Sequence, residues 1–94
     1  MMSLEEIKQK TIPILREAGV TKSSIFGSYT RNEQNEESDI DILVELSQGK
    51  SLFDLVRLQL ELEKSLQKKV DLVDFGSIKP QLKNYILDHQ VKIL

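Results

Sequence analysis

The fold of this chain can be worked out from residues 25–44, which have the sequence IFGSYTRNEQNEESDIDILV. A short apolar run ends in Gly27-Ser28, a polar connection follows, and apolar sequence then resumes with two aspartates, Asp39 and Asp41, one residue apart. Side chains on a β-strand alternate between its two faces. The stretch therefore predicts a strand whose two carboxylates share one face, while the apolar residues between and after them enter a core.

Two carboxylates on one face repel each other and are costly to keep ionised unless a cation lies between them. Oxygen ligands of this kind suit Mg²⁺, which takes one or two carboxylates together with phosphate oxygens and water. Upstream, Gly27 lets the backbone approach a phosphate, and the amide groups at a helix start favour an anion. Two plainer interpretations stay open: the acids could line a solvated strand face, and Gly27-Ser28 could be an ordinary strand-to-helix turn.

Hydrophobic periodicity and capping residues predict the other elements. A capping-box pattern at Ser3 begins a first helix, which Pro13 should kink or break and Gly19 should end. A last helix begins near Pro80, with its apolar residues Leu82, Tyr85 and Ile86 on the buried side. Strands are expected over residues 23–26, 39–46 and 69–73, a long helix over 52–66, and a short strand or a packed tail over 91–94. Because strands alternate with helices, the expected fold class is α/β (α+β), a small mixed β-sheet flanked by helices.

The size and composition of the chain narrow its class. Its 94 residues suit one domain, residues 1–94, with 39% hydrophobic and 30% charged residues, as in ordinary globular proteins. The net charge of −2 argues against a general basic surface, so no direct contact with nucleic acid is expected. The absence of cysteine excludes disulfides and thiolate metal sites. No apolar run approaches the roughly 20 residues of a membrane span, and the N-terminus lacks the apolar core of a signal peptide, so we expect a cytoplasmic protein without membrane contact.

The motifs of residues 27–41 resemble the signature of the polymerase-beta-like nucleotidyltransferases: a Gly-Ser pair, Arg31 three residues on, and a D-x-D motif followed by apolar residues. The short chain is similar to the minimal nucleotidyltransferases of that superfamily, over nearly its whole length. Asp71 lies in a later predicted strand, where the family carries a third carboxylate. Asn32 departs from the glycine that often follows the arginine, a mild change because asparagine tolerates left-handed backbone.

The resemblance implies roles for six residues. Asp39 and Asp41 bind the nucleotide-bound Mg²⁺ ion, and Asp71 joins them around a second ion and can accept the proton of the attacking hydroxyl. In two-metal phosphoryl transfer such ions lie roughly 3.5–4 Å apart. Gly27-Ser28 and the planar fork of Arg31 hold the triphosphate.

The resemblance also implies an activity and a partner. A metal-dependent nucleotidyltransferase of this kind transfers AMP from ATP to a tyrosine hydroxyl of a cognate HEPN-domain toxin and so acts as its antitoxin. Two alternatives stay open. The chain could be a catalytically inactive antitoxin that acts by binding alone, or a regulatory subunit of a larger transferase.

The helix expected over residues 52–66 is apolar over an unusually wide arc. One leucine stripe is enough to anchor a helix on a sheet, which leaves Phe53, Val56 and Leu60 as a surplus second stripe. Such a patch on a small protein typically marks a contact surface, so we expect these three residues to bind a partner or a second copy of the chain. The alternative is that residues 91–94 fold back over the stripe.

Overall fold

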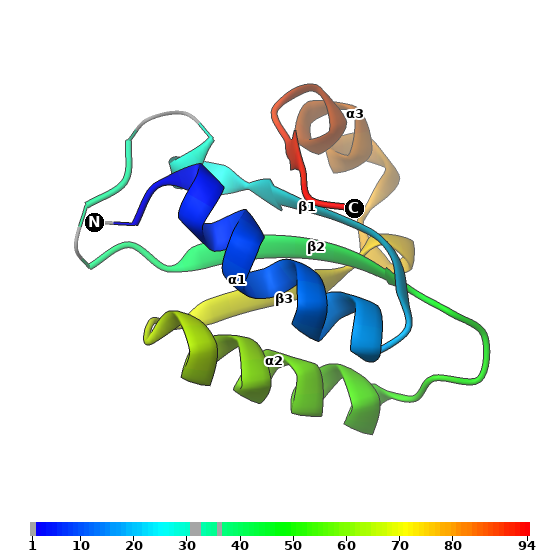
Figure 1. Cartoon of the computed structure of the whole chain (residues 1–94). Coiled ribbons are helices and arrows are strands. Elements are labelled where there is room, and N and C mark those ends of the chain that lie inside the picture. The colour runs from blue at the N-terminus through cyan, green and yellow to red at the C-terminus, as the bar shows by residue number, and fades with distance from the viewer. Residues whose placement is uncertain (1, 31–32, 36) are drawn as a thin grey trace.

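The computed structural model describes residues 2–30, 33–35 and 37–94 (Figure 1). The chain alternates helices and strands, as the sequence predicts, with two short 3-10 turns, η1 and η2. The elements in order are α1 (Leu4–Glu17), β1 (Val20–Phe26), η1 (Gly27–Tyr29), β2 (Ile40–Leu46), α2 (Leu52–Leu66), β3 (Val70–Asp74), η2 (Phe75–Ser77), α3 (Pro80–Asp88) and β4 (Val91–Lys92).

The strands form one mixed sheet with the order β3-β2-β1-β4. β1 pairs antiparallel with both β2 and β4, whereas β2 and β3 run parallel. A parallel pair needs a long crossover, and α2 supplies it between β2 and β3. The small mixed sheet flanked by helices expected from the sequence is confirmed.

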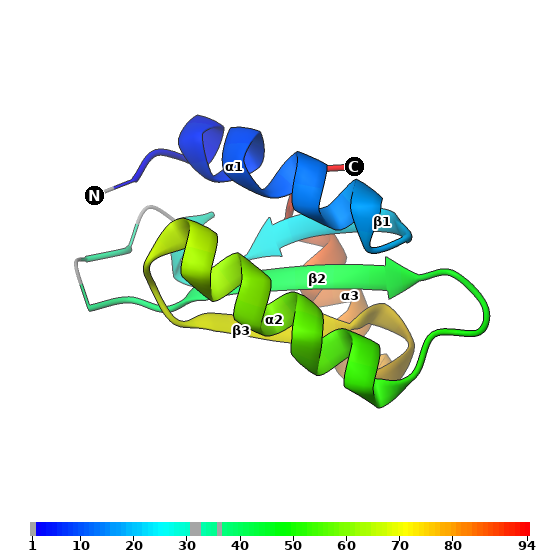
Figure 2. The same ribbon diagram turned by 60° about the horizontal axis from the view of Figure 1, so that its bottom comes forward.

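The two longer helices cover one face of the sheet, while α3 lies on the opposite side (Figures 1 and 2). The core lies between that face and the two helices. From the helices it takes Ile7 and Leu15 of α1 and Leu58, Leu62 and Leu66 of α2. From the strands it takes Val20, Ile25, Ile40, Ile42, Val44 and Val70. Alternate residues of β2 and β3, including the aspartates, therefore face away from α1 and α2.

α1 begins and ends where the sequence predicts. The Ser3 hydroxyl oxygen accepts a hydrogen bond from the Glu6 amide at 3.1 Å, and Gly19 follows the helix with a positive φ of 81°. The prediction of a break at Pro13 is wrong, because the helix continues through it to Glu17. Pro13 is exposed, so water can bind the carbonyl that the missing amide leaves unpaired.

One prediction about the C-terminal part is also wrong, and an alternative that was open there is excluded. Leu82 and Tyr85 are exposed rather than buried, because no residue of α3 is buried and the apolar side of this helix is left largely uncovered. Residues 91–94 do not cover α2. Instead β4 pairs with β1, and the amides of Ile93 and Leu94 donate to the Ser23 carbonyl at 2.8 and 3.0 Å. The second stripe of α2 is left exposed.

Across the described ranges, no helix combines the length and apolar character that a bilayer span requires.

Candidate functional site

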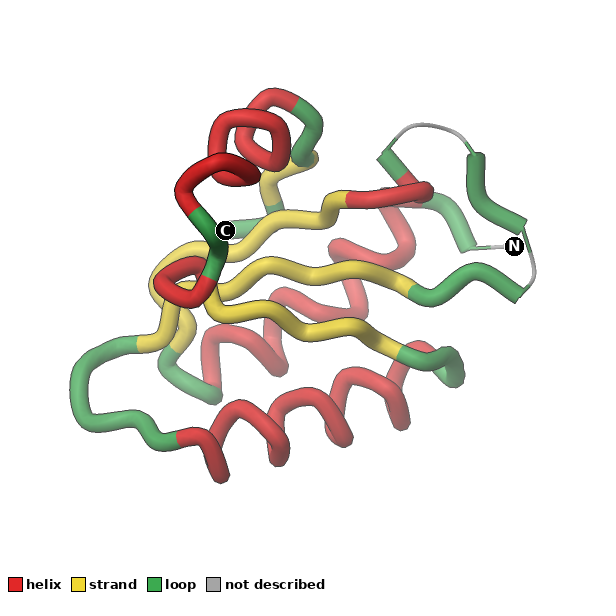
Figure 3. Tube along the Cα trace, turned by 180° about the vertical axis from the view of Figure 1, so that it is seen from behind, coloured by secondary structure: helices red, strands yellow, loops and turns green. Residues whose placement is uncertain are grey.

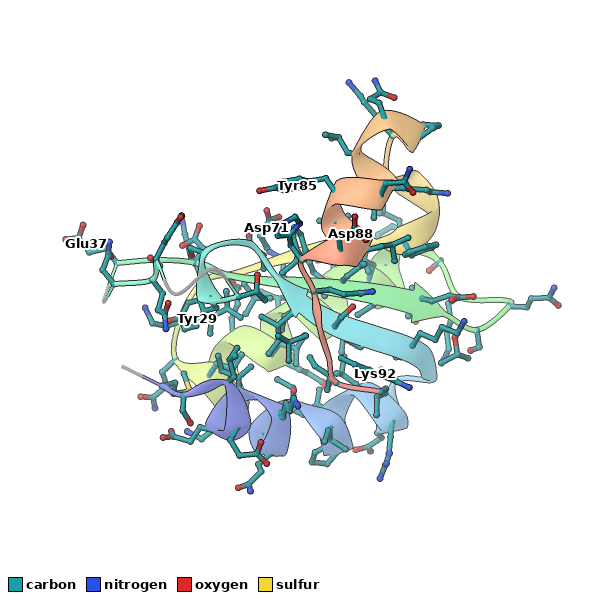
Figure 4. All side chains as sticks on the ribbon, turned by 90° about the horizontal axis from the view of Figure 1, so that it is seen from above. Tyr29, Glu37, Asp71, Tyr85, Asp88 and Lys92 are labelled. Atoms are coloured by element: carbon teal, nitrogen blue, oxygen red, sulfur yellow. The ribbon has the colours of Figure 1, made fainter. Side chains whose placement is uncertain are left out.

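One row of residues crosses the sheet at the end where β2 and β3 begin. Phe26 pairs with Asp41 across the antiparallel ladder, and Asp41 pairs with Asp71 across the parallel one. Directly opposed residues share a face, so the two carboxylates are neighbours on the face away from α1. Figure 4 shows the Asp71 side chain on that side of the ribbon. The structure thus brings together Asp41 and Asp71, which are 30 positions apart in the sequence.

Gly27 lies directly against the Asp41 carboxylate. Its φ is 78°, a conformation that L-residues with a side chain rarely adopt. A Cβ atom built there would overlap the Asp41 carboxylate oxygen and lie only 2.9 Å from the Asp41 Cγ. The glycine therefore leaves open the space beside Asp41, so that the backbone at residue 27 and the carboxylate can both reach one small ligand.

The turn after Gly27 holds the backbone in place. The Thr30 amide and hydroxyl both donate to the Gly27 carbonyl, at 3.1 and 2.8 Å, and the Glu33 amide donates to the Ser28 carbonyl at 3.0 Å. Tyr29 is buried in the core beneath this turn. Ser28 is half-buried within the turn, immediately after the glycine.

Asp39 lies just before β2 and is exposed. The backbone on both sides of it is tied to the start of β3, because the Lys68 ammonium donates to the Ser38 carbonyl at 3.1 Å and the Ile40 amide donates to the Lys69 carbonyl at 3.0 Å. Strand alternation puts Asp39 on the side of Asp41. All three acids therefore lie at one end of the sheet, with Asp39 outermost.

The donors at this end fit one metal ion of a particular kind. Within residues 2–30, 33–35 and 37–94, no three acidic or histidine side chains lie close enough together to hold a metal. Asp41 and Asp71 are adjacent by register, and Mg²⁺ needs only one or two carboxylates when phosphate oxygens and water complete its shell. The chemistry of this pair therefore suits a Mg²⁺ ion that arrives with a phosphate ligand.

Arg31, the third expected phosphate ligand, lies outside the described residues, as does Asn32. The sequence reasoning missed Phe26, which completes the row with Asp41 and Asp71. The available signal was its place directly before Gly27, at the end of an apolar strand. Thr30, whose side chain fixes the Gly27 carbonyl, was missed as well.

Comparison with known proteins identifies close relatives. The family model described as polymerase beta, nucleotidyltransferase, matches residues 9–94. A Methanocaldococcus jannaschii protein named as a candidate protein adenylyltransferase is 59% identical over 93 residues, covering 99% of this chain and 100% of its own. The protein adenylyltransferase MntA of Thermococcus cleftensis is 36% identical over 97 residues, covering 99% of this chain and 98% of its own.

Solved structures with the same fold include a candidate minimal nucleotidyltransferase, with a TM-score of 0.85 and 32% identity over 96% of this chain and 95% of that one. A toxin–antitoxin structure with AMP-PNP has a TM-score of 0.81 and 28% identity, covering 93% and 72% of the two chains. A complex of a tri-AMPylated Shewanella oneidensis HEPN toxin with its MNT antitoxin has a TM-score of 0.75 and 25% identity, covering 96% and 71%.

Proposed function

Because this chain belongs to the polymerase beta nucleotidyltransferase family, we propose that it transfers AMP from ATP to a hydroxyl group of a protein partner. The chain is a nucleotidyltransferase by its family, and the relatives named as protein adenylyltransferases support a protein acceptor. The observation that carries the proposal is the position of Gly27 against Asp41, with Asp71 beside Asp41 in the ladder.

The chain's own residues divide the work. Gly27, Ser28 and Arg31 hold the β- and γ-phosphates of ATP. Asp41 and Asp71 would hold one Mg²⁺ ion that arrives with the phosphates, and the second ion expected from the sequence would also need Asp39. When bound, the metal neutralises charge on the phosphates and lowers the pKa of the acceptor hydroxyl.

The transfer step balances as a simple displacement. The acceptor oxygen forms a bond to the α-phosphorus, the bond from that phosphorus to the oxygen shared with the β-phosphate breaks, and pyrophosphate leaves from the Gly27 side. Asp71 accepts the proton of the hydroxyl, as a carboxylate placed on the acceptor side can. Asp71 is exposed, so an acceptor on another protein can reach it.

We assign the acceptor to a tyrosine of a HEPN-domain toxin, which makes the chain its antitoxin. Support comes from the related complex of a tri-AMPylated HEPN toxin with an MNT antitoxin, and from the toxin–antitoxin structure that contains AMP-PNP. We treat residues 1–94 as one nucleotidyltransferase domain that acts in the cytoplasm.

The exposed stripe on α2 favours a second candidate function. Phe53 and Leu60 are 83% and 61% exposed, and an apolar surface of this kind suits protein contact. An antitoxin that acts by binding alone would need only this surface and not the carboxylates.

The deciding experiment is incubation with ATP labelled at the α-phosphate, Mg²⁺ and the HEPN-domain protein. Label on the HEPN-domain protein, lost with chelator and with Asp41→Asn, supports the transferase. A stable complex that carries no label under the same conditions supports the binding function and rejects the transferase.

A further inference from the structure

A groove of about 660 Å³ opens on the same sheet face as the carboxylates. It lies under η2, the end of α3 and the C-terminal segment, whereas the half of the face nearer the carboxylates has no helix over it in the described chain (Figure 3). The side chains that matter for its chemistry are Ser24, Leu43, Glu45, Phe75, Leu87 and Gln90.

The ladder register connects the groove to the carboxylates. Asp41, Leu43 and Glu45 alternate with core residues along β2 and so share one face. Leu43 pairs with Ser24 in the row next to the carboxylates, and Glu45 pairs with Lys22 in the row after that. Successive rows lie about 6.6 Å apart, two residues of strand rise. The groove therefore begins one row from Asp41 and extends away from it along the strands.

In-line displacement fixes which part of ATP can enter this groove. The attacking and leaving oxygens lie on opposite sides of the α-phosphorus. With pyrophosphate at Gly27, at the end of β1, and the acceptor at Asp71 on β3, that line crosses the strands. The nucleoside leaves the α-phosphorus at a large angle to this line, hence roughly along the strands. Of the two such directions that keep the nucleoside on the sheet, one leaves it before β2 begins, and the other passes over Leu43 into the groove.

We infer that the groove binds the nucleoside of the triphosphate, with the ribose over Leu43 and the base beneath Phe75 and Leu87. This inference rests on the proposed function, since it takes the phosphate positions from it. The acceptor protein is a less suitable occupant. It must reach Asp71, on the edge strand β3, whereas the groove is lined from β1 and β2 and by no residue of β3 in the described chain.

The groove lining has the chemistry that a base requires. Leu43 is buried, and Phe75 and Leu87 add apolar surface for the faces of a ring. The Ser24 hydroxyl donates to the Gln90 side-chain oxygen, so the Gln90 amide nitrogen is turned to donate elsewhere. Glu45 supplies an acceptor. Donors and acceptors fixed beside an apolar slot can distinguish one base edge from another.

Comparing the affinities of two ligands distinguishes contacts to the nucleoside from contacts to the phosphates. One ligand is ATP, and the other is inorganic tripolyphosphate, which has no nucleoside. Calorimetry with Mg²⁺ on the full chain gives the Kd of each. We expect Leu87→Trp, which fills the groove from α3, to raise the Kd for ATP about tenfold and to change the Kd for tripolyphosphate by less than about twofold. The matched control is Leu82→Trp, on the same helix and exposed, but outside the residues that line the groove. It should change neither value.

Glu45→Ala provides a second test, because Glu45 is exposed and its removal leaves the core intact. This variant should raise the Kd for ATP about threefold and leave the Kd for tripolyphosphate unchanged. Folding of every variant is checked by circular dichroism. The inference is overturned if both folded groove variants bind ATP like the wild type, or if they weaken both ligands equally. If the wild type binds neither ligand with Mg²⁺, the proposed function itself fails, and the inference with it.

Discussion

At the scale of single residues, Gly27 matters for two reasons, its backbone conformation and the space that it leaves beside the Asp41 carboxylate. Its positive φ makes any L-residue unfavourable, and its missing side chain leaves room for the Asp41 carboxylate. These two demands can be separated, because Gly49 has a φ of 88° with nothing within 4 Å of the place where a Cβ would lie.

We therefore expect Gly27→Ala to lower the rate of transfer about 100-fold, since the new Cβ would push the Asp41 carboxylate out of place and spoil the alignment of the reacting groups. Gly49→Ala should leave the rate unchanged. Gly49→Ala should lose about 1 kcal/mol of stability, the cost of the strained backbone. Gly27→Ala should lose more, because its Cβ also overlaps the Asp41 carboxylate. Rates come from label transfer and stabilities from urea unfolding. Equal loss of activity in both variants would mean that backbone strain alone is responsible.

The acids divide by role. Asp71→Asn should bind ATP with Mg²⁺ within about twofold of wild type, because Asp41 remains as a carboxylate ligand and Mg²⁺ needs only one or two. It should transfer at least ~100-fold more slowly, because Asp71 is assigned as the proton acceptor. Asp41→Asn should lose both binding and transfer, since Asp41 lies against Gly27 where the phosphates bind. Calorimetry and label transfer measure the two effects separately. Transfer at the wild-type rate by Asp71→Asn would remove this residue from the mechanism.

Much of this site could be predicted at the residue scale. Strand alternation predicts that Asp39 and Asp41 share one face, and the core positions of Ile40 and Ile42 put Asp41, which lies between them in β2, on the face away from the core. The direct pairing of Asp41 with Asp71 could not be predicted, because the register of parallel strands depends on how α2 packs between them. The contact of Gly27 with Asp41 could not be predicted either, since glycine permits a positive φ but does not require one.

At the scale of elements, the start of α2 carries a titratable cap. The Asp54 carboxylate accepts hydrogen bonds from the Ser51 amide at 2.8 Å and the Ser51 hydroxyl at 3.1 Å. The amide hydrogen bond, then the hydroxyl one, hold the pKa of Asp54 below its ordinary value of 3.8. A carboxyl group whose pKa falls on folding stabilises the folded state above its unfolded pKa, and this contribution is lost as pH falls through the folded pKa.

Asp54→Ala should therefore lower the melting temperature at pH 7, and the difference from wild type should shrink once the pH falls below about 3.8. Thermal unfolding followed by circular dichroism at pH 7 and at lower pH measures it. Glu61→Ala is the control, an exposed acid on the same helix beyond its first turn. A difference that stays constant with pH would show that Asp54 acts through packing or helix propensity and not through its charge.

The helices α2 and α3 show where hydrophobic periodicity fails to predict burial. In α2 the predicted stripe of Leu55, Leu58, Leu62 and Leu66 is buried except at Leu55, which is half-buried, because α1 and β3 pack against this helix. In α3 the same reasoning predicts that Tyr85 is buried, which is wrong. Tyr85 is exposed and stacks on His89, with ring centroids 4.5 Å apart. A hydrophobic period identifies the apolar side of a helix, but it cannot say whether the rest of the chain reaches far enough to cover that side.

At the scale of the whole molecule, the two surfaces proposed here, the carboxylate site and the exposed stripe of α2, lie on opposite sides of the sheet. α2 covers the face away from the carboxylates (Figure 2). Its second stripe of apolar side chains is exposed to solvent. With residues 91–94 paired to β1, nothing in the described chain covers this stripe. A protein partner that docks on α2 would therefore leave the carboxylate face free for ATP, and binding could be lost by mutation without loss of nucleotide chemistry.

The double variant Phe53→Asp with Leu60→Lys tests this separation. Both side chains are exposed, so the fold should be retained, while binding of the HEPN-domain partner should weaken at least ~30-fold, as when buried apolar anchors of an interface are lost. Mg²⁺-dependent ATP binding should stay at the wild-type level. The matched control is Leu82→Asp with Tyr85→Lys, which makes the same charge change on the exposed side of α3 and should leave partner binding intact. If the α2 variant unfolds, the stripe contributes to the core. If it binds its partner as the wild type does, the interface lies on another face, and loss of binding in the α3 variant would place it beside the groove.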